Sequence, residues 1–425
     1  MVIIMFRLVD KKDNLYGVLD TDDGVIEYLD YQIILKLLGV GYTIEGCNST
    51  DTGWHFDVDD SEYHVIHKGY KFRLYPDKAQ RDYFDKCFGC CRFIWNKMLE
   101  DKIAYYEETG ESLTVYPSDY KSDFPFLKEV DSSALNYELM HLNTAYKNFF
   151  RDKSVGFPKF KSKRDRHKSF STYNTTNGIR IERFYIRLPK IGLVRMHQSQ
   201  EIQGEIKTVT VSQVPSGKYY VSMNCEIWYQ KLPKTDKMVG IDLGIKDLVI
   251  TSSGVVYENP KTIRKYEEQL AKLHRQLAHK VKGSRNYEKQ RIKVARLQEK
   301  IANIRKDNLH KISHELISDN QVIISEDLNV KGMVKNHCLA KSISDASWYE
   351  LTRQLAYKSA WTGRIYHKVD RFYASSQICS CCGFKNPEVR DLSIREWICP
   401  QCGAHHDRDK NAAVNILNRG IADLA

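Results

Sequence analysis

The pattern of apolar and polar residues predicts a basic strand and two buried helices in the first half of the chain. Residues 70–76, YKFRLYP, alternate as a strand, and Pro76-Asp77 is a typical helix start. The apolar residues after it recur at intervals of three and four: Phe84, Cys87, Phe88, Cys91, Ile94, Trp95 and Met98. A second amphipathic helix is expected over residues 133–151. Because Cys87, Cys90 and Cys91 follow the buried face, we expect them in the core and not as metal ligands.

Later segments predict a β-rich region and a helical hairpin. Residues 179–229 alternate in short runs with a turn at residues 215–217, Pro-Ser-Gly, which indicates a small β-barrel or sheet. Residues 261–311 have helical periodicity on both sides of Gly283-Ser284. We therefore expect two long helices joined by a turn there.

Composition restricts the class of protein. With 425 residues, 42% of them hydrophobic and 28% charged, the chain is long enough for about three domains and is not disordered. The longest apolar runs, residues 1–9 and 33–40, are short and contain charges, and no secretory signal is present, so we expect no membrane anchor. Five of the eleven cysteines lie within residues 379–402, which is typical of metal binding in a reducing compartment. The expected location is the cytoplasm.

The net charge is unevenly distributed. The chain carries +11 at pH 7, but residues 1–66 carry −9 and the remainder carries +20. Residues 261–311 alone hold +11. A basic body favours an anionic partner, whereas the carboxylates of residues 1–66 disfavour phosphate binding there. We expect this acidic segment to form a small α+β module with a turn at Asp23-Gly24 and a helix near residues 30–39.

Basic residues that alternate with aromatic ones mark candidate nucleic-acid contacts, because such mixtures neutralise phosphates and stack on bases. A solvated basic loop or hairpin is the alternative interpretation. The candidates lie in the basic strand, in the loop after residue 156, and in the basic hairpin: Lys71, Arg73, Phe157, Lys159, Phe160, Lys161, Lys163, Arg164, Arg166, Lys261, Arg264, Lys265 and Arg275.

Three acidic sites lie in or next to apolar segments of the sequence. Asp242 lies in the apolar strand MVGIDLG, and Glu326 and Asp327 follow the apolar run QVIIS. A third acidic site, Asp407 and Asp409, precedes a helix expected to begin near Ala412. Carboxylates brought together from three elements could hold two Mg²⁺ ions, which would activate water and stabilise a leaving oxygen during phosphodiester cleavage. An isolated Asp at a strand end is the alternative for Asp242.

The most specific motif is a set of four cysteines. Cys379 and Cys382 form one C-x₂-C pair, and Cys399 and Cys402 form a second pair after sixteen intervening residues. A glycine follows each pair, which permits tight turns, so the spacing predicts a Cys₄ zinc ribbon with one structural Zn²⁺ ion. Cys381 is expected to be a bystander, and His405 and His406 are weaker alternative ligands.

Taken together, these motifs resemble one family. GIDLG, ISEDL, the Cys₄ ribbon and DRDKNAAVNIL are similar, in order and spacing, to the split RuvC-like nuclease of transposon-encoded TnpB proteins and of the related miniature type V CRISPR effectors. YKFRLYPDKAQ, FGCCRFIWNKML, GFPKFKSKRD and WYELTRQLAYKSAWTGR also look like TnpB. The resemblance covers roughly residues 68–425, and residues 1–66 lie outside it.

The resemblance implies a multidomain α+β fold. Its expected parts are the acidic module of residues 1–66, a wedge β-barrel of residues 67–80 and 152–236, a helical recognition lobe of residues 81–151, an RNase H-like (RuvC) α/β nuclease of residues 237–374 and 406–425, and the zinc ribbon of residues 375–405.

It also implies a function, an RNA-guided endonuclease that cuts double-stranded DNA beside a short flanking motif. In this family pattern Asp242, Glu326 and Asp409 hold two Mg²⁺ ions, and Asp409 is preferred to Asp407 because the acid stands two residues before Asn-Ala-Ala. The expected partners are a guide RNA and target DNA, in a prokaryotic cytoplasm and at the nucleoid when DNA is bound. A guide-directed repressor without cleavage and a strand-transfer transposase stay as alternatives. The kind of guide RNA, the flanking motif and the oligomeric state are open.

Overall fold

A computed structural model describes residues 5–9, 15–20, 54–55, 63–175, 178–391 and 393–425. Within the first 62 residues it describes three strands, β1 (Met5–Val9), β2 (Leu15–Asp20) and β3 (Trp54–His55), which form one sheet in the order β2-β1-β3. The turn predicted at Asp23-Gly24 and the helix predicted near residues 30–39 lie outside the described residues. None of the described helices is both long enough and apolar enough to cross a membrane.

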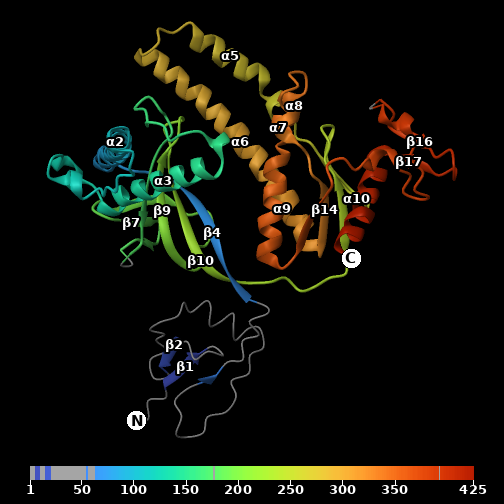
Figure 1. The fold of residues 1–425 in the computed structure, drawn as a ribbon, viewed down its shortest axis with the longest axis horizontal. Coiled ribbons are helices and arrows are strands. Elements are labelled where there is room, and N and C mark those ends of the chain that lie inside the picture. Colours follow the sequence, from blue (N-terminus) through green and yellow to red (C-terminus); the bar gives the residue numbers. More distant parts are fainter. Residues whose placement is uncertain (1–4, 10–14, 21–53, 56–62, 176–177, 392) are drawn as a thin grey trace.

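The first large body combines a seven-stranded sheet with a helical lobe (Figure 1). Its sheet has the order β5-β9-β10-β4-β8-β7-β6, and β4 pairs antiparallel with β10 over its whole length. The strands are β4 (Tyr63–Leu74), β5 (Lys168–Tyr173), β6 (Arg180–Glu182), β7 (Tyr185–Leu188), β8 (Gly192–His197), β9 (Glu205–Gln213) and β10 (Tyr219–Gln230). Because β4 begins at Tyr63, the boundary predicted at residue 67 falls inside a strand.

The helical lobe consists of α2 (Lys78–Thr109), α3 (Ser132–Arg151) and three short 3-10 helices, η1 (Asp119–Lys121), η2 (Pro125–Glu129) and η3 (Lys153–Val155). Asp77 caps α2 as predicted, in a reciprocal capping box with Gln80. Every apolar residue of the predicted seam is buried, and Cys87, Cys90 and Cys91 lie in the core that the lobe shares with the sheet. Their assignment to the core is confirmed.

The second body is built on a five-stranded sheet in the order β13-β12-β11-β14-β15. The strand β11 (Met238–Asp242) pairs antiparallel with β12 (Asp247–Thr251), which pairs antiparallel with β13 (Val256–Glu258). On its other side β11 pairs parallel with β14 (Val322–Glu326), and β14 pairs parallel with β15 (Ile365–Val369). The two central parallel strands therefore end at the same edge of the sheet.

Helices cover both faces of this sheet. On one face α6 (Arg285–Asp319), α8 (Ala340–Ala346) and α9 (Trp348–Thr362) pack against residues such as Ile241 and Ile323. The other face is covered by α10 (Arg408–Leu424), which packs on Ile324 (Figure 1). The predicted start of this helix near Ala412 was wrong, because Asp407 accepts a hydrogen bond from the Lys410 amide and begins the helix earlier.

Two glycines allow α10 to lie directly on the strands. A Cβ atom on Gly240 of β11 would stand 2.2 Å from the Ala413 carbonyl oxygen, and one on Gly420 of α10 would stand 2.4 Å from the Ile324 side chain. At both positions helix and strand approach this closely only because the glycine has no side chain of its own. The N-terminal turn of α10 is thereby fixed beside the ends of β11 and β14.

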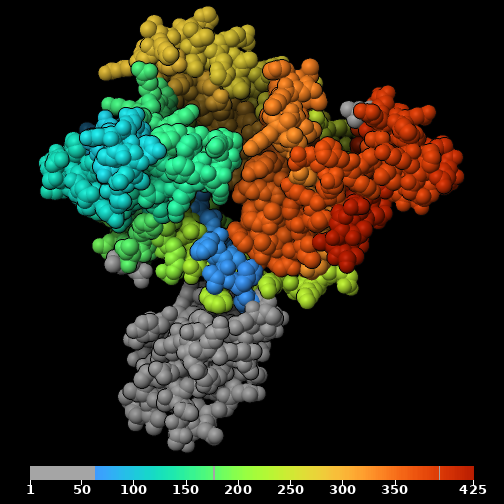
Figure 2. All heavy atoms as spheres, viewed as in Figure 1, coloured from blue at the N-terminus to red at the C-terminus, as the bar shows by residue number. Residues whose placement is uncertain are grey.

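The basic segment forms an arm that reaches from the second body to the first. It contains α4 (Thr262–Lys265), α5 (Glu267–Ala278) and α6, with the predicted turn at Gly283 and a Ser284 cap. On α6, Glu288 pairs with Arg166, and Glu299 pairs with Lys218 of the first body at 3.0 Å. Figure 2 shows the two bodies side by side with β4 visible between them.

The rest of the second body is the ribbon and short connecting helices: α7 (Val330–Met333), η4 (Ser375–Gln377), η5 (Pro387–Arg390), β16 (Glu396–Ile398) and β17 (His405–Asp407). The strands β16 and β17 form an antiparallel pair. Because β17 runs directly into α10, the ribbon and the helix form one continuous segment of chain.

Candidate metal centres

The structure brings Asp242, Glu326 and Asp409 together. Asp242 and Glu326 are the last residues of β11 and β14, whose parallel register pairs Gly240 with Ile324 and Ile241 with Ser325. Side chains alternate along a strand, so Asp242 shares the face of Gly240, and Glu326 shares the face of Ile324. Gly240 and Ile324 both pack against α10. Asp409 lies in the first turn of that helix, and both Glu326 and Asp409 are near enough to Asp242 to raise its pKa, so three separate elements place carboxylates around Asp242.

The electrostatics of the cluster are those of like charges held out of water. Burial raises the pKa of Asp242 to about 8, and the neighbouring carboxylates of Glu326 and Asp409 add to this effect. Burial also raises the pKa of Glu326, although a hydrogen bond from the Ser375 hydroxyl opposes the rise. A bound cation would stabilise the ionised form of these carboxylates, because it offsets both the burial and the repulsion.

The donor set fits a hard divalent cation, because Mg²⁺ prefers carboxylate oxygens. Two neighbouring acids are already engaged elsewhere. Asp327 pairs with Lys368 at 3.4 Å and with Arg371, and Asp407 caps α10. Of the triad, Asp409 has Arg395 at 3.5 Å, and that arginine side chain is 60% exposed. The available carboxylates are thus the three predicted from sequence.

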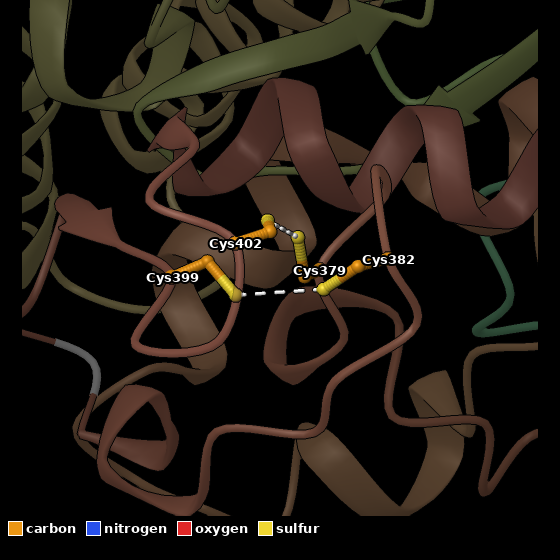
Figure 3. A group of neighbouring side chains, drawn as sticks. All are labelled: Cys379, Cys382, Cys399 and Cys402. Atoms are coloured by element: carbon orange, nitrogen blue, oxygen red, sulfur yellow. Dashed lines mark hydrogen bonds between the residues drawn. The ribbon is translucent and has the colours of Figure 1, made fainter.

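The four predicted cysteines also form a cluster (Figure 3). The sulfur atoms of Cys379 and Cys402 lie 3.6 Å apart, and those of Cys382 and Cys399 also lie 3.6 Å apart. Four sulfurs at about 2.3 Å from a tetrahedral zinc ion would be separated by about 3.8 Å, so the cluster has the size of a Zn²⁺ site. Burial opposes ionisation of Cys399, but amide hydrogen bonds from Cys402 and Gln401 prevail and lower its pKa to about 7.

Two further donors lie beside the cluster. The His406 Nε2 atom is 3.0 Å from the Cys379 sulfur, and Cys379, Cys381 and His406 make a smaller group of possible ligands. The four-cysteine group alone supplies the complete tetrahedron of a closed structural site. We therefore interpret His406 as a neighbour of the Cys379 sulfur and not as a zinc ligand.

Sequence reasoning missed the polar residues that connect the two centres. Ser375 donates its hydroxyl to Glu326, and Asn411 and Asn415 of α10 donate to carbonyl groups around the first cysteine pair. One signal was available, because the two asparagines stand one helical turn apart in the otherwise apolar stretch NAAVNIL. Ser375 carries no comparable sequence signal.

The candidate nucleic-acid residues of β4 contact aromatic rings. Lys71 lies 4.7 Å from the centre of the Tyr220 ring, and Arg73 lies near Tyr75 and Tyr220. Burial lowers the pKa of Lys71, and nearby Lys306 lowers it further. Lys71 and Lys306 therefore lie close together where the arm meets the sheet, and Glu299 lies there as well.

Part of the basic loop before β5, residues 157–167, makes contacts within the protein. Lys161 pairs with the buried Glu138, and Arg166 makes two hydrogen bonds of 2.9 Å to Glu288. Trp95 donates to the Lys159 carbonyl, while Phe157 packs on Tyr146 and Phe149. Lys159, Phe160, Lys163 and Arg164 are exposed, and so are Phe157 and Arg166 despite these internal contacts.

The remaining candidates lie near the carboxylate cluster or on the arm. Lys261 and Arg264 line a pocket of about 490 Å³ together with Lys246, Lys341 and Arg395, and two acids, Glu267 and Asp345, also line it. Since Arg395 also contacts Asp409, the pocket adjoins the cluster. Lys265 and Arg275 are exposed on α4 and α5.

We predict that Asp242→Asn raises the melting temperature of the Mg²⁺-free protein more at pH 8 than at pH 4. The pKa of Asp242 is raised from 3.8 to about 8, so the folded protein keeps a proton that the unfolded chain releases. Wild-type stability from this group is therefore lost as the pH rises through that window, and an amide is unaffected. Thermal melts of both proteins between pH 4 and pH 8 test this. A difference in melting temperature that stayed constant over this range would contradict the prediction.

A second prediction concerns zinc. Cys399→Ser should release the metal and lower solubility, because the site loses one of four ligands and zinc binding supplies folding energy. Cys381→Ser is the matched control and should retain one zinc ion per chain. Elemental analysis of the purified proteins distinguishes the two, and equal zinc content would refute the four-cysteine site.

Comparison with known proteins adds three family matches. A model described as "Probable transposase" matches residues 208–337, a "Cas12f1-like, TNB domain" model matches residues 348–416, and a "Helix-turn-helix domain" model matches residues 66–111. Among solved structures, a Cas12f1-sgRNA-target DNA complex is similar in fold, with a TM-score of 0.53 and 14% identity over 83% of this chain and 99% of that chain.

Curated relatives match almost end to end. A Streptomyces pristinaespiralis protein named "Putative RNA-guided DNA endonuclease" is 39% identical over 85% of this chain and 91% of its own length. The Escherichia coli K12 protein "Putative RNA-guided DNA endonuclease InsQ" is 36% identical over 84% of this chain and 93% of its own length. With this similarity over nearly the whole of both relatives, the chain belongs to the TnpB family of RNA-guided DNA endonucleases.

Proposed function

We propose that this protein is an RNA-guided endonuclease that cuts double-stranded DNA at the cluster of Asp242, Glu326 and Asp409. Its family membership supports the activity, and the similar Cas12f1 complex contains a guide RNA and target DNA. The observation that carries the proposal is the convergence of three carboxylates from β11, β14 and α10, whose only polar side-chain contacts in the described residues are the Ser375 hydroxyl on Glu326 and the exposed Arg395 beside Asp409.

The topology of the second body supports an RNase H-like nuclease domain. Three antiparallel strands, β11, β12 and β13, are followed along the chain by β14 and β15, which add in parallel on the other side of β11. We assign this domain to residues 237–374 and 406–425, with the ribbon inserted between them. The seven-stranded sheet would then be the wedge and α2 with α3 the recognition lobe.

Asp242, Glu326 and Asp409 would hold the Mg²⁺ ions of such a nuclease. When bound, the ions would polarise the scissile phosphodiester and supply hydroxide for its hydrolysis. The protein's own contribution is a rigid, partly desolvated set of oxygens, fixed by the edge of the sheet and by the close approach of α10. The pocket beside Arg395 would bind phosphates of the strand that enters the cluster.

Recognition would be divided between RNA and protein. Base pairing with the guide would read the target sequence, while the protein would bind the duplex backbone and a short flanking motif. The exposed basic residues of the arm and of the loop before β5 suit backbone contacts.

Strand transfer is a second candidate, because one matching family model is described as a transposase. The same carboxylates could serve either reaction. Hydrolysis leaves free DNA ends, whereas strand transfer joins an end to a new strand, so the products distinguish the two functions.

We predict that Glu326→Gln abolishes cutting of matched DNA but leaves guide and DNA binding intact. The substitution preserves side-chain size and removes only the charge that would hold a cation. The measurement is cleavage by the protein purified with its own RNA in Mg²⁺, with a gel-shift assay for binding, and Asp242→Ala should behave in the same way.

Asp327→Asn is the matched control. Its carboxylate is adjacent in sequence but is paired with Lys368 and Arg371, so this variant should cut at nearly the wild-type rate. Cutting by Glu326→Gln at that rate would refute the catalytic assignment.

A further inference from the structure

A buried serine links the zinc ribbon to the carboxylate cluster. Ser375 begins η4, only 5% of its surface is exposed, and its hydroxyl donates to the Glu326 carboxylate. Within the described residues, burial alone does not force such a bond, because the hydroxyls of the buried Ser359 and Thr262 have no partner. The contact therefore needs its own explanation.

The backbone of Ser375 is held by the helix that carries Asp409. The side-chain amide of Asn415 donates to the Ser375 carbonyl at 2.8 Å and to the Ile378 carbonyl at 2.6 Å. Asn415 is 3% exposed, so water does not compete for these bonds. The serine hydroxyl is consequently presented to Glu326 from a fixed position.

The same helix also holds the first zinc-binding turn. Asn411, one turn before Asn415, donates to the Ile378 carbonyl at 2.7 Å and accepts from the Ser380 amide at 2.9 Å. Ile378 and Ser380 are the chain neighbours of Cys379, the first predicted zinc ligand. Two asparagines on one side of α10 thus connect the ribbon, Ser375 and Asp409.

Glu326 needs this support because of its surroundings. Its carboxylate lies beside Asp242, and when both groups are ionised, as cation binding requires, their repulsion favours rotation of the longer side chain away from the cluster. A hydrogen bond from a fixed donor opposes that rotation. Groups that hold metal-binding side chains in this manner commonly change metal affinity by about 10–100-fold.

We propose that Ser375, held by Asn415, is a positioning residue that orients Glu326 for divalent-cation binding. This inference rests on the proposed nuclease function and adds a role for the ribbon: its folded zinc-binding turn fixes the segment that carries Ser375. The ribbon and the carboxylate cluster then act as one rigid unit.

The test is Mn²⁺ titration of the full-length, zinc-loaded protein, followed by electron paramagnetic resonance. Ser375→Ala should weaken Mn²⁺ binding about tenfold, while zinc content, melting temperature and guide-RNA binding stay close to wild type. Ser375→Thr restores a hydroxyl and should recover most of the affinity. Ser359→Ala, which removes a buried hydroxyl without a partner, should bind Mn²⁺ like wild type.

Glu326→Gln in the same series separates the positioning role of Ser375 from the existence of the cation site. If it weakens Mn²⁺ binding and Ser375→Ala does not, the positioning role is overturned and the cation site stands. Equal loss in Ser375→Ala and Ser375→Thr would also overturn the role, because packing and not the hydroxyl would be responsible. If Glu326→Gln binds Mn²⁺ like wild type, the proposed cation site itself fails.

Discussion

The close contact of α10 with two parallel strands is the constraint on which the rest of this structure depends. Gly240 and Gly420 have no side chain of their own at the points of closest contact between helix and sheet, so the first turn of α10 lies beside the ends of β11 and β14. Asp242 and Glu326 are thereby held near Asp409, although burial disfavours the ionisation of Asp242 and Glu326 by raising the pKa of each. Folding thus maintains an unfavourable arrangement of charge, which is typical of a functional site.

The four-cysteine ribbon is attached to the same helix. It is inserted immediately before α10, and the asparagine side chains of that helix bind the backbone on both sides of Cys379. The closed shape of the four-cysteine group fits a structural ion. Ser375, beside the ribbon, is hydrogen-bonded to Glu326, and we propose that the ribbon acts on the cluster through this contact.

The sequence was most informative where local pattern and chemistry agree. The buried face of α2, the turn at Gly283 and the cysteine group were all predictable, since each depends on residues close in the chain. The start of α10 was misjudged because Asp407 had been considered as a ligand and not as a helix cap. Contacts such as Ser375 with Glu326 join distant segments, and no local pattern encodes them. Lys161 and Arg166 likewise have internal partners that their basic setting did not reveal.

The central claim is that Asp242, Glu326 and Asp409 form a cation site, and crystals soaked in Mn²⁺ test it most directly. Anomalous scattering should place manganese among these three side chains in the wild-type protein, and the peaks should be absent in Asp409→Asn. Manganese bound at Asp327 or Asp407 instead, or peaks that persist unchanged in Asp409→Asn, would contradict the account.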